Sequence, residues 1–260
     1  MSRVAIVTGA SSGIGAATAV RLGSDGWTVV LVARRAAELE AVAGRVRAAG
    51  GVAVVEAADA SDGAAAQAMV DRTVAVHGAP DAVIHCAGAG AWRFLEETTP
   101  DELETMMAAP YLAAANVDRA VLPHLLAARR GVLIHVNSPA CGVPWPGATG
   151  YTAARWALRG LHEALRADLA GTGVRTSHVV FGEVSSPYFD VNEGAREALP
   201  GIARLIPVLT PEACAGILSG LVHRPRAQVV RPFMLWVFWV TAKVAPGMVR
   251  WLLVRTGRRH

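Results

Sequence analysis

Apolar runs of four to eight residues recur along the chain and alternate with longer stretches of helical pattern. The apolar runs, rich in Val, Ile and Ala, predict buried strands over Val4–Val7, Trp27–Ala33, Val52–Ala57, Asp81–His85, Gly131–Asn137 and Val174–Phe181. The intervening stretches predict helices over Gly15–Leu22, Ala36–Ala49, Ala64–His77, residues 101–129 and Tyr151–Ala170. Strands that are apolar throughout and alternate with helices predict a parallel sheet covered on both faces. We therefore expect an α/β fold, a Rossmann-type doubly wound parallel sheet in a single domain.

The regular alternation ends near residue 184, and two segments of different character follow. Residues 184–210 are irregular and contain several prolines and glycines. Such a segment fits either a substrate lid or a surface loop without function. Residues 229–260 are expected to form an apolar C-terminal extension of the main domain, residues 1–228, rather than an independent domain.

The apolar part of the extension, residues 229–254, is a poor candidate for a transmembrane helix. Its unbroken apolar piece, Phe233 to Val240, is far too short to span a bilayer. Pro246-Gly247 predicts a break between two short helices. A helix packed on the domain and a contact between subunits are two interpretations. The third is a membrane interface, which would suit Trp236, Trp239 and Trp251.

Composition and charge narrow the class of protein. The chain has 260 residues, of which 53% are apolar, and a formal net charge of +4. Basic residues are spread along the chain except in the last eleven positions, so we expect no nucleic-acid partner; a basic tail beside apolar sequence fits an anionic membrane surface better. Three scattered cysteines indicate a reducing compartment, and residues 1–9 leave no room for a signal peptide. We expect a cytoplasmic protein, with peripheral membrane contact through residues 229–254 left open.

A glycine-rich segment follows the first predicted strand and opens the first predicted helix: Thr8-Gly-Ala-Ser-Ser-Gly-Ile-Gly15. Glycines at such a turn let backbone N–H groups approach a pyrophosphate, and the helix N-terminus favours its negative charge. Because the segment lies at the first strand-to-helix turn of an alternating chain, it predicts a dinucleotide site. The contacting residues would be Gly9, Ser11, Ser12, Gly13, Ile14 and Gly15.

Two arginines, Arg34 and Arg35, follow the second predicted strand, where a dinucleotide fold holds the adenosine ribose. An acidic residue there binds the ribose 2′-hydroxyl of NAD, whereas arginine accommodates the 2′-phosphate of NADP. We therefore expect NADP rather than NAD, with Arg34 as the first candidate; two solvated arginines at a helix start are the alternative. Asp59, after the third strand, is a candidate acceptor for the adenine amino group or else a helix N-cap.

Further motifs follow the glycine-rich segment in a fixed order: Asp59, His85-Cys-Ala-Gly88, Ser138, Tyr151 and Phe181-Gly-Glu-Val184. Their order and spacing, over about residues 3–187, resembles the short-chain dehydrogenase/reductase family. The resemblance implies that residues 1–228 are a dinucleotide-binding and catalytic domain. It also implies a homodimer or homotetramer that packs through the helices predicted over 101–129 and 151–170. The further cofactor contacts it implies are Ala60, Ala87, Gly88, Tyr151, Arg155, Gly182 and Val184.

The family's catalytic set is Asn, Ser, Tyr and Lys, and two of these four positions differ here. Ser138 and Tyr151 match, but Arg155 stands in place of the lysine and Pro110 in place of the asparagine. The resemblance implies that Tyr151 passes its proton to the substrate oxygen while Ser138 orients the carbonyl. Arg155, one helical turn after Tyr151, would lower the pKa of the tyrosine and hold the cofactor ribose as a permanent cation. Pro110 predicts a kink in the long helix.

We expect an enzyme that uses NADP to interconvert a hydrophobic secondary alcohol and its ketone, with Ser138, Tyr151 and Arg155 as catalytic residues. The alternatives are a non-catalytic dinucleotide-binding protein and a membrane-surface scaffold of the same fold. No metal site is expected, because His85-Cys86 has no second group of ligands at suitable spacing, and the sequence suggests no partner for His135 or His178. The apolar residues expected at the mouth of the site are Trp92, Phe94, Val143, Trp145, Tyr188 and Phe189.

Overall fold

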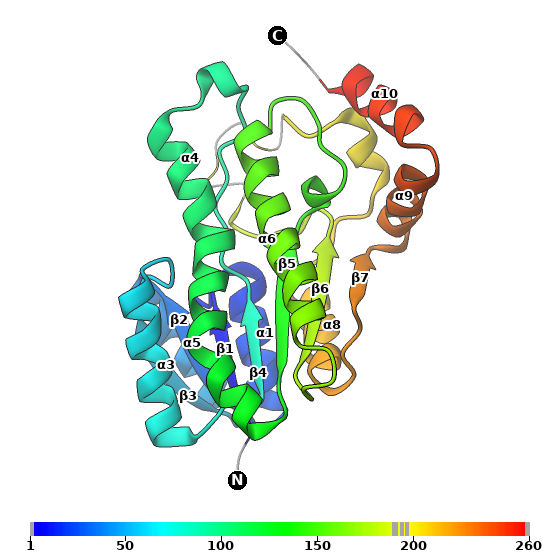
Figure 1. Cartoon of the computed structure of the whole chain (residues 1–260). Helices are drawn as coiled ribbons and strands as arrows, with labels where there is room; N and C mark the ends of the chain where they lie inside the picture. Colours follow the sequence, from blue (N-terminus) through cyan, green and yellow to red (C-terminus); the bar gives the residue numbers. More distant parts are fainter. Residues whose placement is uncertain (1–2, 189–191, 193–194, 196–197, 258–260) are drawn as a thin grey trace.

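A parallel sheet of seven strands forms the centre of the computed structural model, which describes residues 3–188, 192, 195 and 198–257 (Figure 1). The strand order is β3-β2-β1-β4-β5-β6-β7, and every pairing is parallel. This order is that of the Rossmann fold with one strand added at an edge, so the predicted fold class is confirmed. The strands are β1 (Val4–Thr8), β2 (Thr28–Ala33), β3 (Val52–Ala57), β4 (Ala82–His85), β5 (Val132–Asn137), β6 (Arg175–Phe181) and β7 (Gln228–Arg231).

Helices cover both faces of the sheet, as strands without a polar face require. Three of them pack on one face: α1 (Gly13–Ser24), α2 (Ala36–Ala48) and α8 (Pro211–His223). Three others pack on the opposite face: α3 (Gly63–His77), α5 (Ala113–Ala128) and α6 (Thr149–Asp168). Trp27 and Leu22 are fully buried in the first layer, and Met69 and Leu125 in the second. Each such side chain contributes about 1.5–3 kcal/mol on burial, so these two layers supply much of the stability of the fold.

The helix predicted over residues 101–129 is interrupted where Pro110 lies. It is divided into α4 (Pro100–Met107), a π-helical turn η2 (Ala108–Leu112) and α5. Within the turn the amide of Ala113 bonds to the carbonyl of Ala108, five residues back. A proline has no N–H for the ordinary ladder, and the wider turn accommodates this loss. The predicted irregularity is therefore present as a π-turn, with Pro110 buried.

The C-terminal part of the chain completes the sheet and then forms two helices. The boundary expected between residues 228 and 229 falls inside β7, an edge strand that the apolar pattern did not distinguish, and α8 was also missed. The predicted break at Pro246-Gly247 is confirmed, because α9 (Phe233–Val244) ends there and α10 (Pro246–Thr256) begins with the proline in its first turn. In the described ranges, no helix combines the length and the apolarity that crossing a membrane requires.

Candidate active site

A cleft of about 1510 Å³ opens at the carboxyl ends of the strands, which is where ligands bind in open α/β sheets. Helices α4, α9 and α10 rise around this end of the molecule (Figure 1). The cleft wall includes every residue predicted for the site: Gly9, Ser11, Ser12, Gly13, Ile14, Gly15, Arg34, Arg35, Asp59, Ala60, Ala87, Gly88, Ser138, Tyr151, Arg155, Gly182 and Val184. Of the expected mouth residues, Trp92, Val143, Trp145 and Tyr188 line it. Phe94 is not among the lining residues, and Phe189 lies outside the described residues.

The glycine-rich segment has the backbone shape that close approach of a phosphate requires. Gly9 and Gly13 have φ values of +66° and +52°, in the left-handed region that disfavours side chains. A Cβ at Gly9 would come within 2.7 Å of the amide nitrogen of Ala87, and one at Gly15 would overlap the carbonyl of Gly9. Helix α1 begins at Gly13, so its unbonded N–H groups face the cleft. These features fit the pyrophosphate of a dinucleotide.

Arg34 and Arg35 lie on the cleft wall beyond the end of β2. Arg35 donates to the hydroxyl of Ser11 at 3.3 Å and pairs with Glu38 at 3.1 Å. Burial acts to raise the pKa of Asp59, but hydrogen bonds from Ser61 and the charge of Arg34 outweigh it and lower that pKa. Asp59 is not the N-cap of α3, since Asp62 accepts the cap hydrogen bonds from Ala64 and Ala65.

Ser138 and Tyr151 reach the cleft from different elements. Ser138 follows β5, and its hydroxyl oxygen accepts from the amide of Ala140 at 3.4 Å at the start of the short helix η3 (Pro139–Cys141). Tyr151 lies in the first turn of α6 and is only 4% exposed. In this contact the serine oxygen acts as an acceptor, so its O–H group can still donate a hydrogen bond to a ligand.

Arg155 lies where the helical spacing from Tyr151 predicts it. Its guanidinium carbon is 4.9 Å from the centroid of the Tyr151 ring, and a Cβ at Gly88 would come within 2.7 Å of its Nη2. The side chain is 7% exposed, and its buried Nε has no hydrogen-bond partner among the described residues. A buried donor without an acceptor is costly. Because Arg155 also lines the cleft, its guanidinium beside Tyr151 fits a ligand with hydroxyl groups, such as a ribose.

Tyr188 is a polar neighbour of Tyr151 that the sequence indicated only as an apolar wall residue. Its hydroxyl accepts from Nε1 of Trp92 at 3.3 Å and is also hydrogen-bonded to Tyr151. Burial, followed by the charge interaction with Tyr151, raises the pKa of Tyr188 above its usual range. Tyr188 is therefore held as a neutral phenol against the candidate catalytic tyrosine.

Asn137 joins the strand that carries Ser138 to the helix that carries Tyr151. Its Nδ2 donates to the backbone carbonyl of Arg155 at 3.0 Å, and its Oδ1 accepts from the amide of Ser138 at 2.8 Å. Sequence reasoning missed this residue because it ends an apolar run. The feature of the sequence that could have identified Asn137 was its amide side chain, because a buried amide at a strand end requires polar partners.

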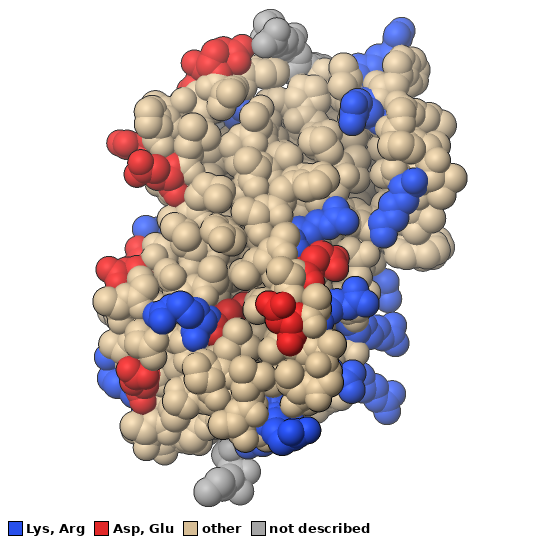
Figure 2. Space-filling view, in the orientation of Figure 1, with Lys and Arg blue, Asp and Glu red and all other residues tan. Residues whose placement is uncertain are grey.

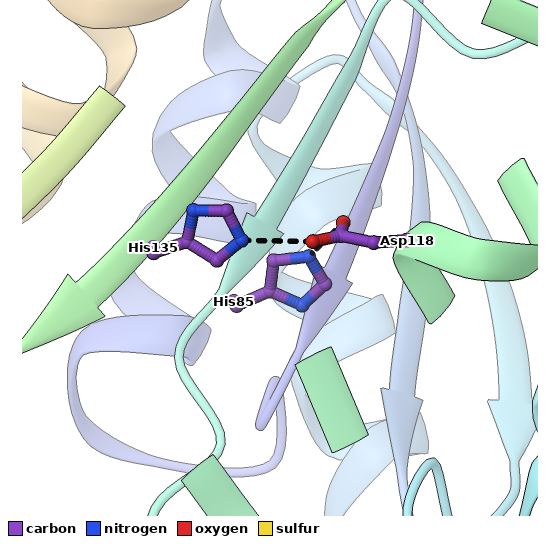
Figure 3. Close-up of side chains that lie close together, drawn as sticks. All are labelled: His85, Asp118 and His135. Carbon is purple, nitrogen blue, oxygen red and sulfur yellow. Dashed lines mark hydrogen bonds and ion pairs between the residues drawn. The ribbon is translucent and has the colours of Figure 1, made fainter. Parts of the chain in front are cut away.

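Three buried histidines lie in register across the sheet. His85 pairs with His135, and His135 with His178, on the adjacent strands β4, β5 and β6, so the three side chains point to one face. Asp118 of α5 lies against the first two, and its two carboxylate oxygens each accept from one Nε2 at 2.8 Å (Figure 3). His162 of α6 continues the row, with its Nδ1 3.4 Å from Nδ1 of His135 and its ring stacked on His178. His135 and His178, for which the sequence suggested no partner, thus belong to one network.

Burial and neighbouring charges set the ionisation of this histidine row. Burial acts to raise the pKa of Asp118, but charge interactions with His85 and His135 and hydrogen bonds from them hold it well below its usual range. Burial, with the nearby histidines adding to it, lowers the pKa of His162 to about 3 and that of His178 to about 3. Asp118 therefore remains an ionised carboxylate, and the imidazoles of His162 and His178 stay neutral at neutral pH.

His85, Asp118 and His135 also form a group whose ligand atoms lie within 4.8 Å of one another, as in some metal sites. The rings of His85 and His135 are stacked, with an angle of 11° between their planes and 5.1 Å between centroids. A metal ion lies in the plane of each imidazole that binds it, and two stacked rings do not direct their lone pairs to one point. The geometry therefore favours two hydrogen bonds to Asp118 over a shared ion (Figure 3).

Comparison with known proteins identifies the family. The short chain dehydrogenase family profile matches residues 3–196. An uncharacterized oxidoreductase of Listeria innocua is 31% identical over 236 residues, which cover 89% of this chain and 95% of the relative. An uncharacterized oxidoreductase of Mycobacterium tuberculosis is 34% identical over 239 residues, which cover 87% and 92%. The chain belongs to the short-chain dehydrogenase/reductase family of NAD(P)-dependent oxidoreductases.

Solved structures of relatives agree with this assignment. A metagenomic short-chain oxidoreductase in complex with NADP has 33% sequence identity and a TM-score of 0.75, over 88% of this chain and 95% of that one. A short chain dehydrogenase from Mycobacterium paratuberculosis bound to NAD has 25% identity and a TM-score of 0.77, over 88% and 95%. These relatives carry different cofactors, so the choice in this chain depends on its own residues after β2.

Proposed function

We propose that the protein is an NADP-dependent oxidoreductase that interconverts a hydrophobic secondary alcohol and its ketone, with Tyr151 as the general acid and base. The observation that carries this proposal is the set of residues that line one cleft. A phosphate-binding glycine segment, two arginines, the Ser138–Tyr151 pair and a largely apolar wall all face the same space. A relative with 33% identity is described in complex with NADP, which supports the cofactor assignment.

The position of each side chain in the cleft supports the following roles. Bound nicotinamide supplies or accepts the hydride. Tyr151 transfers its phenolic proton to or from the substrate oxygen, and Ser138 orients that oxygen. Arg155 holds ribose hydroxyls with its guanidinium, which lines the cleft, and places a fixed cation on the Tyr151 ring. Because an arginine does not release its proton at neutral pH, Tyr151 exchanges its proton with solvent rather than with Arg155.

The substrate half of the cleft is apolar and aromatic. A pocket of this kind favours carbonyl compounds with a large hydrocarbon part, which leave water on binding. The side chains that form this wall include Trp92, Trp145, Phe238, Trp239, Leu252 and Leu253.

Titration with NADPH and NADH, followed by a panel of hydrophobic ketones and alcohols, tests the proposal. We expect Arg34→Ala to weaken NADPH binding by about tenfold to a hundredfold, because a charge-assisted bond to the 2′-phosphate is lost. NADH binding should stay within about twofold, since NADH has no such phosphate. Arg45→Ala, an exposed arginine farther along α2, is the matched control and should change neither affinity.

An equal loss of both affinities in Arg34→Ala would contradict the assigned 2′-phosphate contact. NADPH binding without turnover of any compound in a broad panel would instead support the non-catalytic dinucleotide-binding alternative.

Arg155→Lys tests whether the altered catalytic centre is adapted or impaired. We expect kcat/KM to stay unchanged or to fall by up to about tenfold, because lysine does not reproduce the contacts of the guanidinium with the Tyr151 ring and Gly88. The measurement is steady-state turnover of the best substrate in the panel. A rise of several orders of magnitude would show that the arginine impairs a lysine-dependent mechanism.

We also propose a cytoplasmic homo-oligomer, a dimer or tetramer that packs through α5 and α6. Exposed apolar side chains on these helices, Leu126 at 40% and Trp156 at 48%, support an interface there. Sedimentation velocity of the wild type and of Trp156→Glu tests it, because a charge at a packed interface should dissociate the subunits.

A further inference from the structure

The outer face of the two C-terminal helices is apolar and exposed. On α9 the exposed side chains recur at helical spacing, and Phe233 and Val244 are 69% and 81% exposed. On α10, Trp251 and Val254 are each 58% exposed. Contiguous exposure of this kind is uncommon on a soluble monomer and marks an interaction surface. We call it the outer face: Phe233, Trp236, Val240, Val244, Met248, Trp251 and Val254.

The charges around the outer face have one sign. From residue 213 to the end of the chain the sequence contains no aspartate or glutamate. Lys243, Arg250 and Arg255 are exposed on the same two helices, and the guanidinium of Arg255 lies 5.4 Å from the centroid of the Trp251 ring. In Figure 2 the surface over α9 and α10 shows basic side chains among uncharged ones and no acidic ones, whereas acidic side chains lie on the opposite side of the view, near α4, and in its middle.

The opposite faces of α9 and α10 form part of the cleft wall. Leu235, Phe238 and Trp239 line it from α9, and Val249 and Leu253 from α10. The expectation that Trp239 suits a membrane interface is therefore wrong: the side chain is 4% exposed and packs against Gly142 and beneath Arg159. Trp236 and Trp251 remain exposed, at 44% and 58%. The helices have two apolar faces, and only the inner one is covered by the domain.

We propose that the outer face docks on an anionic membrane surface, with α9 and α10 lying in the plane of the interface. Tryptophan and aliphatic side chains enter the headgroup boundary, and the surrounding cations contact anionic lipid headgroups. A second copy of the chain fits less well, because a symmetric contact would bring the cations of one copy (Lys243, Arg250 and Arg255) close to those of the other without an acidic group between them.

Flotation of the full-length protein with lipid vesicles tests the proposal. One set of vesicles contains phosphatidylcholine alone, and the other also contains phosphatidylglycerol. We expect the wild type to float with the anionic vesicles and to be released as salt is raised, because salt screens the headgroup contacts. Lipids brominated near the headgroup end of the acyl chain should quench tryptophan fluorescence, and Trp251→Phe should reduce that quenching.

Two variants separate the apolar and charged contributions. Phe233→Ser combined with Trp251→Ser, and Lys243→Glu combined with Arg250→Glu and Arg255→Glu, should each weaken partition onto anionic vesicles by about tenfold or more. Val76→Ser, which alters an apolar side chain 74% exposed on α3, is the matched control and should bind as the wild type does.

Three results would each overturn the proposal. The first is no flotation of the wild type, and the second is equal partition onto both kinds of vesicle. The third is a wild-type dimer that dissociates in the Phe233→Ser and Trp251→Ser double variant, with no vesicle binding by either protein. An unchanged Tm shows that a variant is folded. The docking measurement needs neither cofactor nor turnover, so its failure and a failure of the proposed oxidoreductase activity are distinguishable.

Discussion

Tyr151→Phe is expected to lower kcat/KM by about a thousandfold while NADPH still binds with an affinity close to that of the wild type. The phenolic hydroxyl is the candidate proton donor, and proton transfer by a positioned side chain contributes roughly a hundred- to ten-thousandfold. The ring remains, so its packing against Trp92, with centroids 5.0 Å apart, and the contact with Arg155 persist. Steady-state kinetics together with NADPH titration measures the two quantities separately.

Tyr188→Phe is the matched control for that experiment, because the two tyrosine hydroxyls are hydrogen-bonded to each other. Burial raises the pKa of Tyr188, which suits a neutral partner rather than the principal acid and base. We expect this variant to lose about tenfold or less. The assignment would be reversed if Tyr188→Phe abolished turnover while Tyr151→Phe remained active.

Acidification is expected to destabilise the protein well before its exposed carboxylates are protonated. The pKa values of His162 and His178 are lowered to about 3 in the folded state, against about 6.5 for an unperturbed histidine. Between these values the unfolded chain binds more protons than the native one, so the free energy of unfolding falls as the pH falls. From pH 7 to pH 5 each residue accounts for about 2 kcal/mol, a large part of a typical total of about 5–15 kcal/mol.

Urea unfolding at pH 7, 6 and 5 measures this loss. The double variant His162→Gln and His178→Gln removes both titrating rings and keeps polar side chains in their places. Its stability at pH 7 should be lower, because hydrogen bonds are lost, but its slope between pH 7 and pH 5 should be much shallower than that of the wild type. The same slope in both proteins would show that other groups cause the acid sensitivity.

Much of the fold could be predicted from the pattern of apolar residues. The six predicted strands are all present, and the glycine-rich segment lies between β1 and α1 as expected. Strand β7 was missed for a physical reason. β7 is a four-residue edge strand whose apolar residues continue toward α9 through Arg231-Pro232, and no turn residue separates the two patterns before that point.

The candidate site could be predicted only where its residues follow local motifs. The glycine-rich segment, Ser138 and Tyr151 have recognisable positions in the chain, and Arg155 follows from helical spacing. The histidine row could not be predicted in this way, because its histidines and Asp118 come from three strands and two helices and meet only once the register is set. A partial signal was present in Asp118, a carboxylate among apolar residues of a helix, since a buried charge requires a polar partner.

Helices α9 and α10 each contribute one face to the cleft wall and the other to the outer face, so the two surfaces are linked. An insertion that lengthens α9 rotates the residues after it by part of a turn and so moves side chains between the cleft wall and the outer face. If the outer face docks on a membrane as proposed, variation in these helices would alter both the shape of the cleft and the contact with the membrane. Descendants of this chain would inherit the two traits as a pair, and exchanging the C-terminal segment between relatives would transfer both together.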